Sequence, residues 1–169
     1  QLEIAPTNFM LNFAIKNNIK KVCIVPEKRQ ELTTEGGLNI KYNFNFLKEN
    51  LPKLFKNNIE VSLFLDPDID NINMCIELGV KAIEFHTGEI SNANEEEEKA
   101  LINKLDNVIA YAGTQGISSR AGHGLNFEKT KKIINIKYLE ELNIGHFIIG
   151  ESIFYGLSDV VKKMKAIIG

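Results

Sequence analysis

The sequence has no tryptophan, two cysteines, four prolines and no long apolar run. Its longest apolar stretches, such as Phe147-Ile148-Ile149, are far shorter than the roughly 20 residues that cross a bilayer. The sequence also opens without a signal-peptide pattern, so we expect a cytosolic protein with no membrane partner. Cys23 and Cys75 form no CxxC pair. We therefore predict two buried, reduced thiols, with a disulfide as the minor alternative.

A large excess of charge of one sign is also missing. The net charge is −2 and the isoelectric point is near 6.0, which excludes a bulk basic field for nucleic acid. Any anion site must therefore be local. With 169 residues, 44% hydrophobic and 25% charged, the chain has the size and composition of one soluble globular domain.

Strand-like and helix-like patterns alternate from end to end. Strand patterns occupy residues 2–5, 22–25, 60–65, 81–85, 116–121 and 142–145, and helical patterns occupy 7–18, 44–56, 70–78, 94–112, 128–135 and 157–168. Pro52 is a reason to doubt the second of these helices, or to expect a kink near its middle. Short connections between alternating elements indicate parallel strands joined by crossover helices.

Two α/β architectures fit this alternation, an open doubly wound sheet and a closed (β/α)8 TIM barrel. No GxGxxG motif is present, and polar clusters follow nearly every strand, which favours the barrel. A barrel usually needs about 250 residues. We therefore predict that residues 1–169 form a single barrel domain that is incomplete at its N-terminus, holding strands 3 to 8 and lacking the first two βα units.

All three histidines, His86, His123 and His146, fall at predicted strand ends. The carboxyl ends of parallel strands meet at one face, so we expect these side chains to share a site. Glu3 and Glu84 also lie at strand ends, where partial burial would raise their pKa toward a range useful for proton transfer. A solvated, inert Glu3 is the alternative. Without an HxH, an HExxH or a cysteine partner, we expect no metal.

Glycines flank the last two histidines. Gly122 and Gly124 surround His123, and Gly145 precedes His146, so backbone amides can approach an anion closely. This predicts a site for a phosphate-bearing small molecule, and simple tight turns are the alternative. The polar stretch PEKRQELTTEGG (26–37) follows a strand and is either a loop over the same face or a solvated turn.

Four motifs, taken in order, resemble the pyridoxine 5′-phosphate synthase family of the deoxyxylulose-phosphate-dependent vitamin B6 pathway. They are VPEKRQELTTEGGL (25–38), EFHTG (84–88), AGHGLNF (121–127) and LNIGHFIIG (142–150). The likeness runs over the whole chain, and LEIA (2–5) is similar to the family's third strand.

This resemblance implies a (β/α)8 barrel that condenses 3-amino-2-oxopropyl phosphate with 1-deoxy-D-xylulose 5-phosphate to pyridoxine 5′-phosphate. It also implies a cytosolic homo-octamer without a metal or organic cofactor. Glu3 would accept protons, Glu84 would stabilise charge in the transition states, and His123 would donate protons. The implied substrate ligands are Thr33 for the deoxyxylulose phosphate and Gly124, Gly145 and His146 for the aminooxopropyl phosphate.

The family's first two strands, with an Asn-Ile-Asp-His segment and a histidine- and arginine-rich loop, have no counterpart in these residues. We favour an upstream segment that supplies them; without one, we expect an inactive truncated barrel that binds a small phosphate ligand. A different sugar-phosphate isomerase or epimerase is a weaker hypothesis. Arg120 and Pro67 are candidate local variants, and the roles of Lys28, Arg29 and Glu35 stay open.

Overall fold

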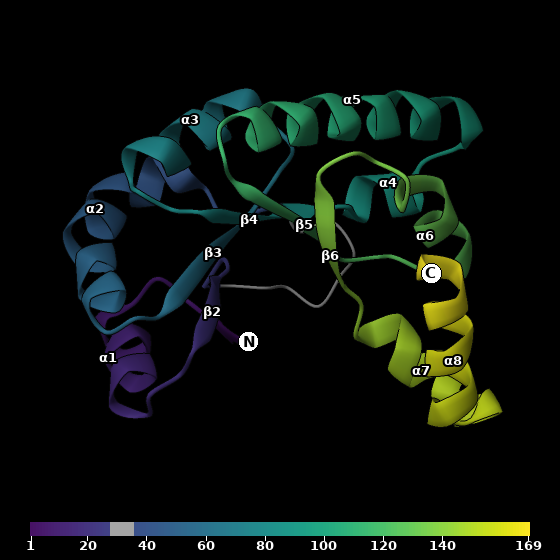
Figure 1. The fold of residues 1–169 in the computed structure, drawn as a ribbon, viewed down its shortest axis with the longest axis horizontal. Helices are drawn as coiled ribbons and strands as arrows, with labels where there is room; N and C mark the ends of the chain where they lie inside the picture. The colour runs from purple at the N-terminus through teal and green to yellow at the C-terminus, as the bar shows by residue number, and fades with distance from the viewer. Residues whose placement is uncertain (28–35) are drawn as a thin grey trace.

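The framework of the protein is one parallel sheet. The computed structural model describes residues 1–27 and 36–169 (Figure 1). The sheet contains β1 (Leu2–Ile4), β2 (Lys21–Ile24), β3 (Glu60–Leu65), β4 (Ala82–His86), β5 (Ser118–Gly122) and β6 (Leu139–Asn143). Each strand pairs in parallel with the next one along the chain. A doubly wound sheet reverses its order at a switch point, so this unbroken order matches a barrel wall instead. β1 and β6 are its two edges in the described residues.

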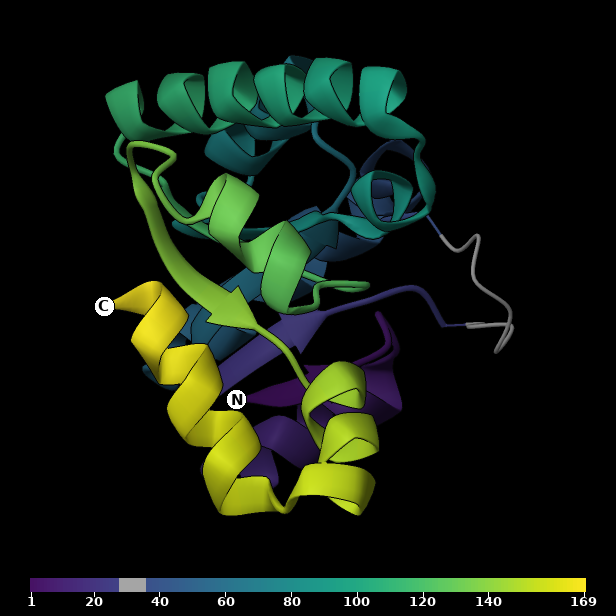
Figure 2. The same cartoon turned by 90° about the vertical axis from the view of Figure 1, so that its right-hand side faces the viewer.

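Helices follow the strands and cover the outer face of the curved sheet (Figure 1). They are α1 (Asn8–Lys16), α2 (Ile40–Lys56), α3 (Ile69–Glu77), α4 (Gly88–Asn92), α5 (Glu95–Thr114), α6 (Phe127–Ile133), α7 (His146–Tyr155) and α8 (Leu157–Ile168). α7 and α8 lie against each other beyond the end of β6 (Figure 2). Within residues 1–27 and 36–169, no helix has the length and apolar composition needed to cross a bilayer.

The two faces of the sheet differ in chemistry. On the outer face, alternate residues such as Ile24, Leu63 and Phe85 join the helices in one apolar core. On the inner face, the strand register places Glu84 beside Phe64 and Arg120. Burial of these apolar side chains holds the helices against the outer face of the sheet. The polar side chains of the inner face are available for a site.

Helix α2 differs from its sequence prediction. It begins at Ile40, four residues earlier than expected, and it continues through Pro52 to Lys56. Proline in a helix interior costs about 3 kcal/mol through its missing N–H and its ring. Leu47, Leu51 and Leu54 are fully buried on the same helix, and their packing offsets that cost. The predicted helix is therefore confirmed despite Pro52.

The end of the sheet also departs from the prediction. β6 runs over Leu139–Asn143, whereas the apolar pattern placed the strand at 142–145. The early residues Glu140 and Glu141 read as polar, but Glu140 accepts a hydrogen bond from Ser118 and Glu141 is 3.7 Å from Arg120. α7 was not predicted as a full helix, because its sequence HFIIGESIFY has no polar stripe that reveals helical periodicity.

Candidate active site

A cavity of about 800 Å³ lies at the carboxyl ends of the strands. Residues from β1, β3, β4 and β6, from α4 and from the segments that follow β5 and β6 line it. Of the residues predicted for the site, it contains Glu3, Glu84, His123, Gly124, Gly145 and His146. Thr33 lies outside the described residues, as do Lys28, Arg29 and Glu35. The expectation that parallel strands gather these side chains into one place is confirmed for these six positions.

Glu84 is the most buried carboxylate of the cavity, with 4% of its surface exposed. Its Oε2 accepts hydrogen bonds from Asn143 Nδ2 at 2.6 Å and from Gln1 Nε2 at 3.4 Å. Cys23 Sγ donates to the same oxygen at 3.6 Å. Burial raises the pKa of Glu84, the nearby Glu3 adds to the rise, and the donated hydrogen bonds oppose it. The pKa of the Glu84 carboxyl group is thus raised, and hydrogen-bond donors from distant parts of the chain fix its position.

Glu3 faces the same cavity from β1, in register with Cys23 on β2. Its side chain is exposed, in contrast to the burial expected from its apolar neighbours. Among the described residues β1 pairs with β2 alone. Glu3 therefore combines access to a ligand with proximity to Glu84.

His123 adopts an unusual backbone conformation, with φ at +80°. A residue with a Cβ rarely occupies this left-handed region, and holding it there costs on the order of 1 to 3 kcal/mol. Thr87, fully buried, contacts the turn from β4: its Oγ1 lies 2.8 Å from the Gly122 carbonyl oxygen and 2.7 Å from that of His123. The Thr87 N–H also donates to the Gly122 carbonyl at 2.9 Å. These contacts fix the backbone that presents the imidazole to the cavity.

Thr87 is a functional candidate that sequence reasoning missed. It lies inside the EFHTG segment, but a threonine after a strand carries no signal of a contact 36 residues away in the sequence. His86 lies on the inner face two residues after Glu84, and its ring centroid is 4.9 Å from that of His123. His146 begins α7 and lines the cavity. His123 and His146 thus line one cavity, whereas His86 packs against His123 and lines a second cavity instead.

The two glycines predicted to bind phosphate, Gly124 and Gly145, differ in whether the structure requires a glycine at their position. Gly124 has φ at +73°, and a Cβ there would approach the Ser91 Cβ to 2.6 Å. Both the positive φ and the lack of space therefore exclude a side chain at this position. A Cβ on Gly145 would meet no described atom within 4 Å, so tight packing does not require this glycine. Gly145 is the N-cap of α7, where first-turn N–H groups without intrahelical partners favour an anion.

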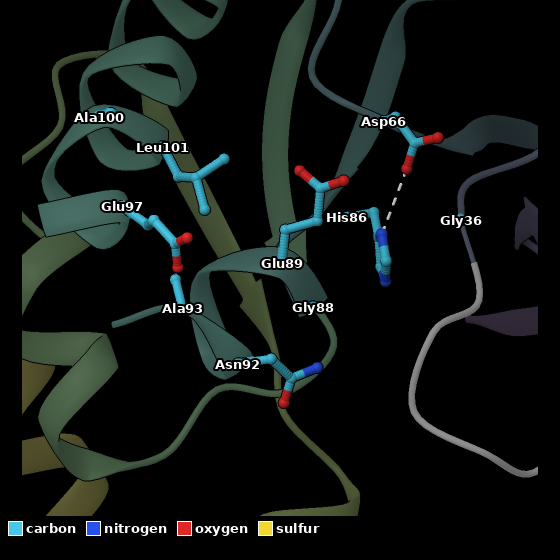
Figure 3. A pocket seen from close by; sticks show the side chains of 10 residues that line it. All are labelled: Gly36, Asp66, His86, Gly88, Glu89, Asn92, Ala93, Glu97, Ala100 and Leu101. Atoms are coloured by element: carbon cyan, nitrogen blue, oxygen red, sulfur yellow. Dashed lines mark hydrogen bonds and ion pairs between the residues drawn. The ribbon is translucent and has the colours of Figure 1, made fainter. Parts of the chain in front are cut away.

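The glycine pair that ends the polar loop packs against the end of β3. Gly37 N–H donates to Asp66 Oδ1 at 2.8 Å. A Cβ on Gly37 would overlap the backbone of Leu65 and Asp66, so only glycine allows this approach. Figure 3 shows Asp66 pointing toward His86, with Gly36 beside it. These residues border a second cavity of about 600 Å³, completed by α4 and the first half of α5.

Arg120 extends the inner-face network below the cavity. It is 4% exposed, forms ion pairs with Glu60 and Glu141, and donates to Gln1 Oε1 at 3.0 Å. A guanidinium only donates, so the Gln1 amide must turn its oxygen to Arg120 and its NH2 group to Glu84. Arg120, treated as a local variant at the sequence level, thus links the sheet interior to the Glu84 carboxylate. Nothing in the structure explains Pro67.

A parallel strand-helix wall with carboxylates, imidazoles and a helix N-terminus at the strand carboxyl ends defines a barrel-type enzyme that acts on an anionic small molecule. The family model described as "Pyridoxal phosphate biosynthesis protein PdxJ" matches residues 1–169. The chain belongs to this family.

Individual relatives agree with the family match. The chain is 44% identical over 167 residues to the pyridoxine 5′-phosphate synthase of Sulfurihydrogenibium sp. (strain YO3AOP1), covering 99% of this chain and 69% of the relative. It is 45% identical over 164 residues to the pyridoxine 5′-phosphate synthase of Ehrlichia chaffeensis (strain ATCC CRL-10679 / Arkansas), covering 97% and 67%. These matches support the synthase hypothesis over the inactive binding module.

Solved structures support the fold. A xylose isomerase domain protein from Planctomyces limnophilus superposes with a TM-score of 0.60 at 11% sequence identity, covering 99% of this chain and 70% of that one. At this identity the likeness concerns the path of the backbone alone.

Proposed function

We propose that this protein is a pyridoxine 5′-phosphate synthase that joins 3-amino-2-oxopropyl phosphate and 1-deoxy-D-xylulose 5-phosphate with loss of phosphate and water. The observation that carries the proposal is the single cavity that holds Glu3, Glu84 and His123 beside Gly145 and His146. Membership of the PdxJ family supports the same reaction.

The first half of the reaction joins an amine to a ketone. The amine nitrogen adds to the carbonyl carbon, and the resulting hydroxyl leaves as water once it receives a proton. His123 supplies that proton, since an imidazole exchanges protons near neutral pH. The cationic imine that remains lies against the Glu84 carboxylate, whose negative charge stabilises it in a site of reduced solvation.

The second half requires a base. Glu3 removes a proton from the carbon next to the imine, and the enamine that forms expels the neighbouring hydroxyl as water. The phosphate group of the deoxyxylulose part then leaves as inorganic phosphate, and one water adds in its place. The carbon between the deprotonated carbon and the one that carried the phosphate attacks the ketone carbon of the aminooxopropyl part, whose oxygen leaves as water, and this bond closes the six-membered ring. The exposure of Glu3 on the cavity wall leaves it accessible to the substrate and to solvent for proton exchange. Glu3 and Glu84 face the same cavity, so a bound cationic imine can contact Glu3 as the base and Glu84 as the group that stabilises its charge.

The phosphate groups orient the substrates. Gly124, Gly145 and His146 hold the phosphate of the aminooxopropyl substrate at the start of α7, and Thr33 contacts the deoxyxylulose phosphate. We further propose that the enzyme works in the cytosol as a homo-octamer and as a transferase that needs no cofactor.

The test is direct turnover. Protein incubated with both phosphates should form pyridoxine 5′-phosphate, detected by chromatography and mass. Glu84→Gln keeps the shape of the side chain and removes its charge, so turnover should fall by about a hundredfold. If the purified protein binds both phosphates and releases no product, the proposal is wrong.

A further inference from the structure

His86 is a buried imidazole to which the mechanism gives no task. It is 6% exposed on β4, and its Nδ1 lies 3.2 Å from Asp66 Oδ1 at the end of β3 (Figure 3). The same Asp66 oxygen accepts the Gly37 N–H at 2.8 Å. The hydrogen bond with His86 lowers the pKa of Asp66, and the Gly37 N–H lowers it further, so the carboxylate is the ionised acceptor and His86 Nδ1 carries the proton and donates.

The second ring nitrogen of His86 defines its charge. Nε2 is buried, and within the described part of the chain it has no hydrogen-bond partner. A proton on Nε2 would leave a charged ring with one N–H buried and unsatisfied, which costs far more than a bare nitrogen. His86 is therefore neutral, with one proton held on Nδ1.

The His86 ring is wedged against the ring of His123. Their centroids are 4.9 Å apart at an interplanar angle of 53°, and Phe64 packs edge-on against His86 at 5.1 Å. A Cβ on Gly88 would approach His86 Nε2 to 2.6 Å and His123 Cδ2 to 3.0 Å, so Gly88 closes the space beside both rings. The exposed His123 side chain thus rests on a wall whose own position Asp66 fixes.

We propose that His86 is a positioning residue: Asp66 holds it as a neutral Nδ1–H imidazole, and its ring sets the angle at which His123 enters the cavity. Neutrality matters because a second cationic ring at this distance would repel the protonated form of His123. The contribution to catalysis rests on the proposed function of His123, whereas the proton arrangement of His86 does not.

The proton arrangement is tested by NMR of the histidine ring nitrogens in the intact protein. We expect His86 to show a protonated Nδ1 and a bare Nε2 at neutral pH. Asp66→Ala should weaken this preference for Nδ1. Glu89→Gln removes an exposed carboxylate that lines the same second cavity and should leave the His86 signals unchanged. A His86 that carries its proton on Nε2, or a proton on each ring nitrogen, overturns the proposal.

Kinetics test the positioning role separately. His86→Phe keeps a ring against His123 and loses the hydrogen bond to Asp66, so kcat should fall about tenfold to a hundredfold while KM changes little. In a His123→Ala background the same change should cost no further activity. Equal losses in both backgrounds would show that His86 acts independently of His123 and would overturn the role. Absence of synthase turnover in the unmodified protein would count against the proposed function, and the NMR result would still be readable.

Discussion

Replacing Thr87 by Val removes a buried hydroxyl that lies between two carbonyl oxygens. The Gly122 carbonyl keeps the Thr87 N–H as a donor at 2.9 Å, so it stays satisfied. The His123 carbonyl loses the hydroxyl at 2.7 Å, and it belongs to a residue whose φ of +80° needs support from its surroundings. The lost hydrogen bond and the loss of support for the strained His123 backbone both lower the stability of the folded protein.

The expected loss of stability follows from these contacts. Removing one part-buried hydrogen bond and leaving the His123 carbonyl without this donor costs about 1 to 2 kcal/mol. For a chain of this size that corresponds to a decrease in Tm of roughly 2 to 8 °C, measured by thermal unfolding followed by circular dichroism. Thr87→Ser keeps the hydroxyl and should retain most of the catalytic rate, whereas Thr87→Val should lower kcat as His123 moves.

Thr130 provides a matched control. It is as fully buried as Thr87, but its hydroxyl has no hydrogen-bond partner in the part of the chain that the structure describes. Thr130→Val should therefore leave Tm unchanged or raise it slightly, because an unsatisfied hydroxyl is replaced by a methyl group. If the two valine variants lose the same stability, the reasoning about the Thr87 hydrogen bond is refuted.

Three other changes have defined outcomes. Lys129 and Lys132 on α6 hold the pKa of the buried Glu98 below its ordinary value near 4.5. Above pH 4.5 the protein should therefore have a larger free energy of unfolding than Glu98→Gln. In urea unfolding, this difference should shrink as the pH falls through the lowered pKa of Glu98. Asn143→Leu removes the shortest hydrogen bond to Glu84, so a ¹³C titration of that carboxyl should show its pKa rising further; an unchanged pKa would contradict the role of the amide. Gly122→Ala places a Cβ onto Glu84 Oε1 and should lower kcat and stability together, with roughly 1 to 3 kcal/mol lost in urea unfolding.

The amino-acid sequence alone carries enough information for the architecture and for the general position of the site. Alternating strand and helix patterns define parallel strands, and the carboxyl ends of parallel strands converge, so the patterns suffice to assign Glu84, His123 and Gly145 to one face. Glu3 is harder to judge. Its neighbours predict an inward direction, which is correct, but they do not predict its exposure.

Contacts between distant residues are beyond the reach of sequence patterns. The link from Arg120 through Gln1 to Glu84 joins residues 119 and 83 positions apart, and no local periodicity reports it. The same holds for Asp66 and His86, whose pairing depends on the stagger of β3 against β4. α7 escapes prediction for a different reason, because an apolar sequence without a polar face has no detectable helical period.

The proposed function requires that the cavity at the strand ends perform acid–base ring closure with Glu84 as its charge stabiliser. The most direct measurement is the rate of pyridoxine 5′-phosphate formation from the two phosphates by the protein and by Glu84→Gln, with phosphate release recorded in the same reaction. We expect product and phosphate in equal amounts from the protein, and a rate about a hundredfold lower from the variant. Equal rates for both proteins would contradict the proposed function.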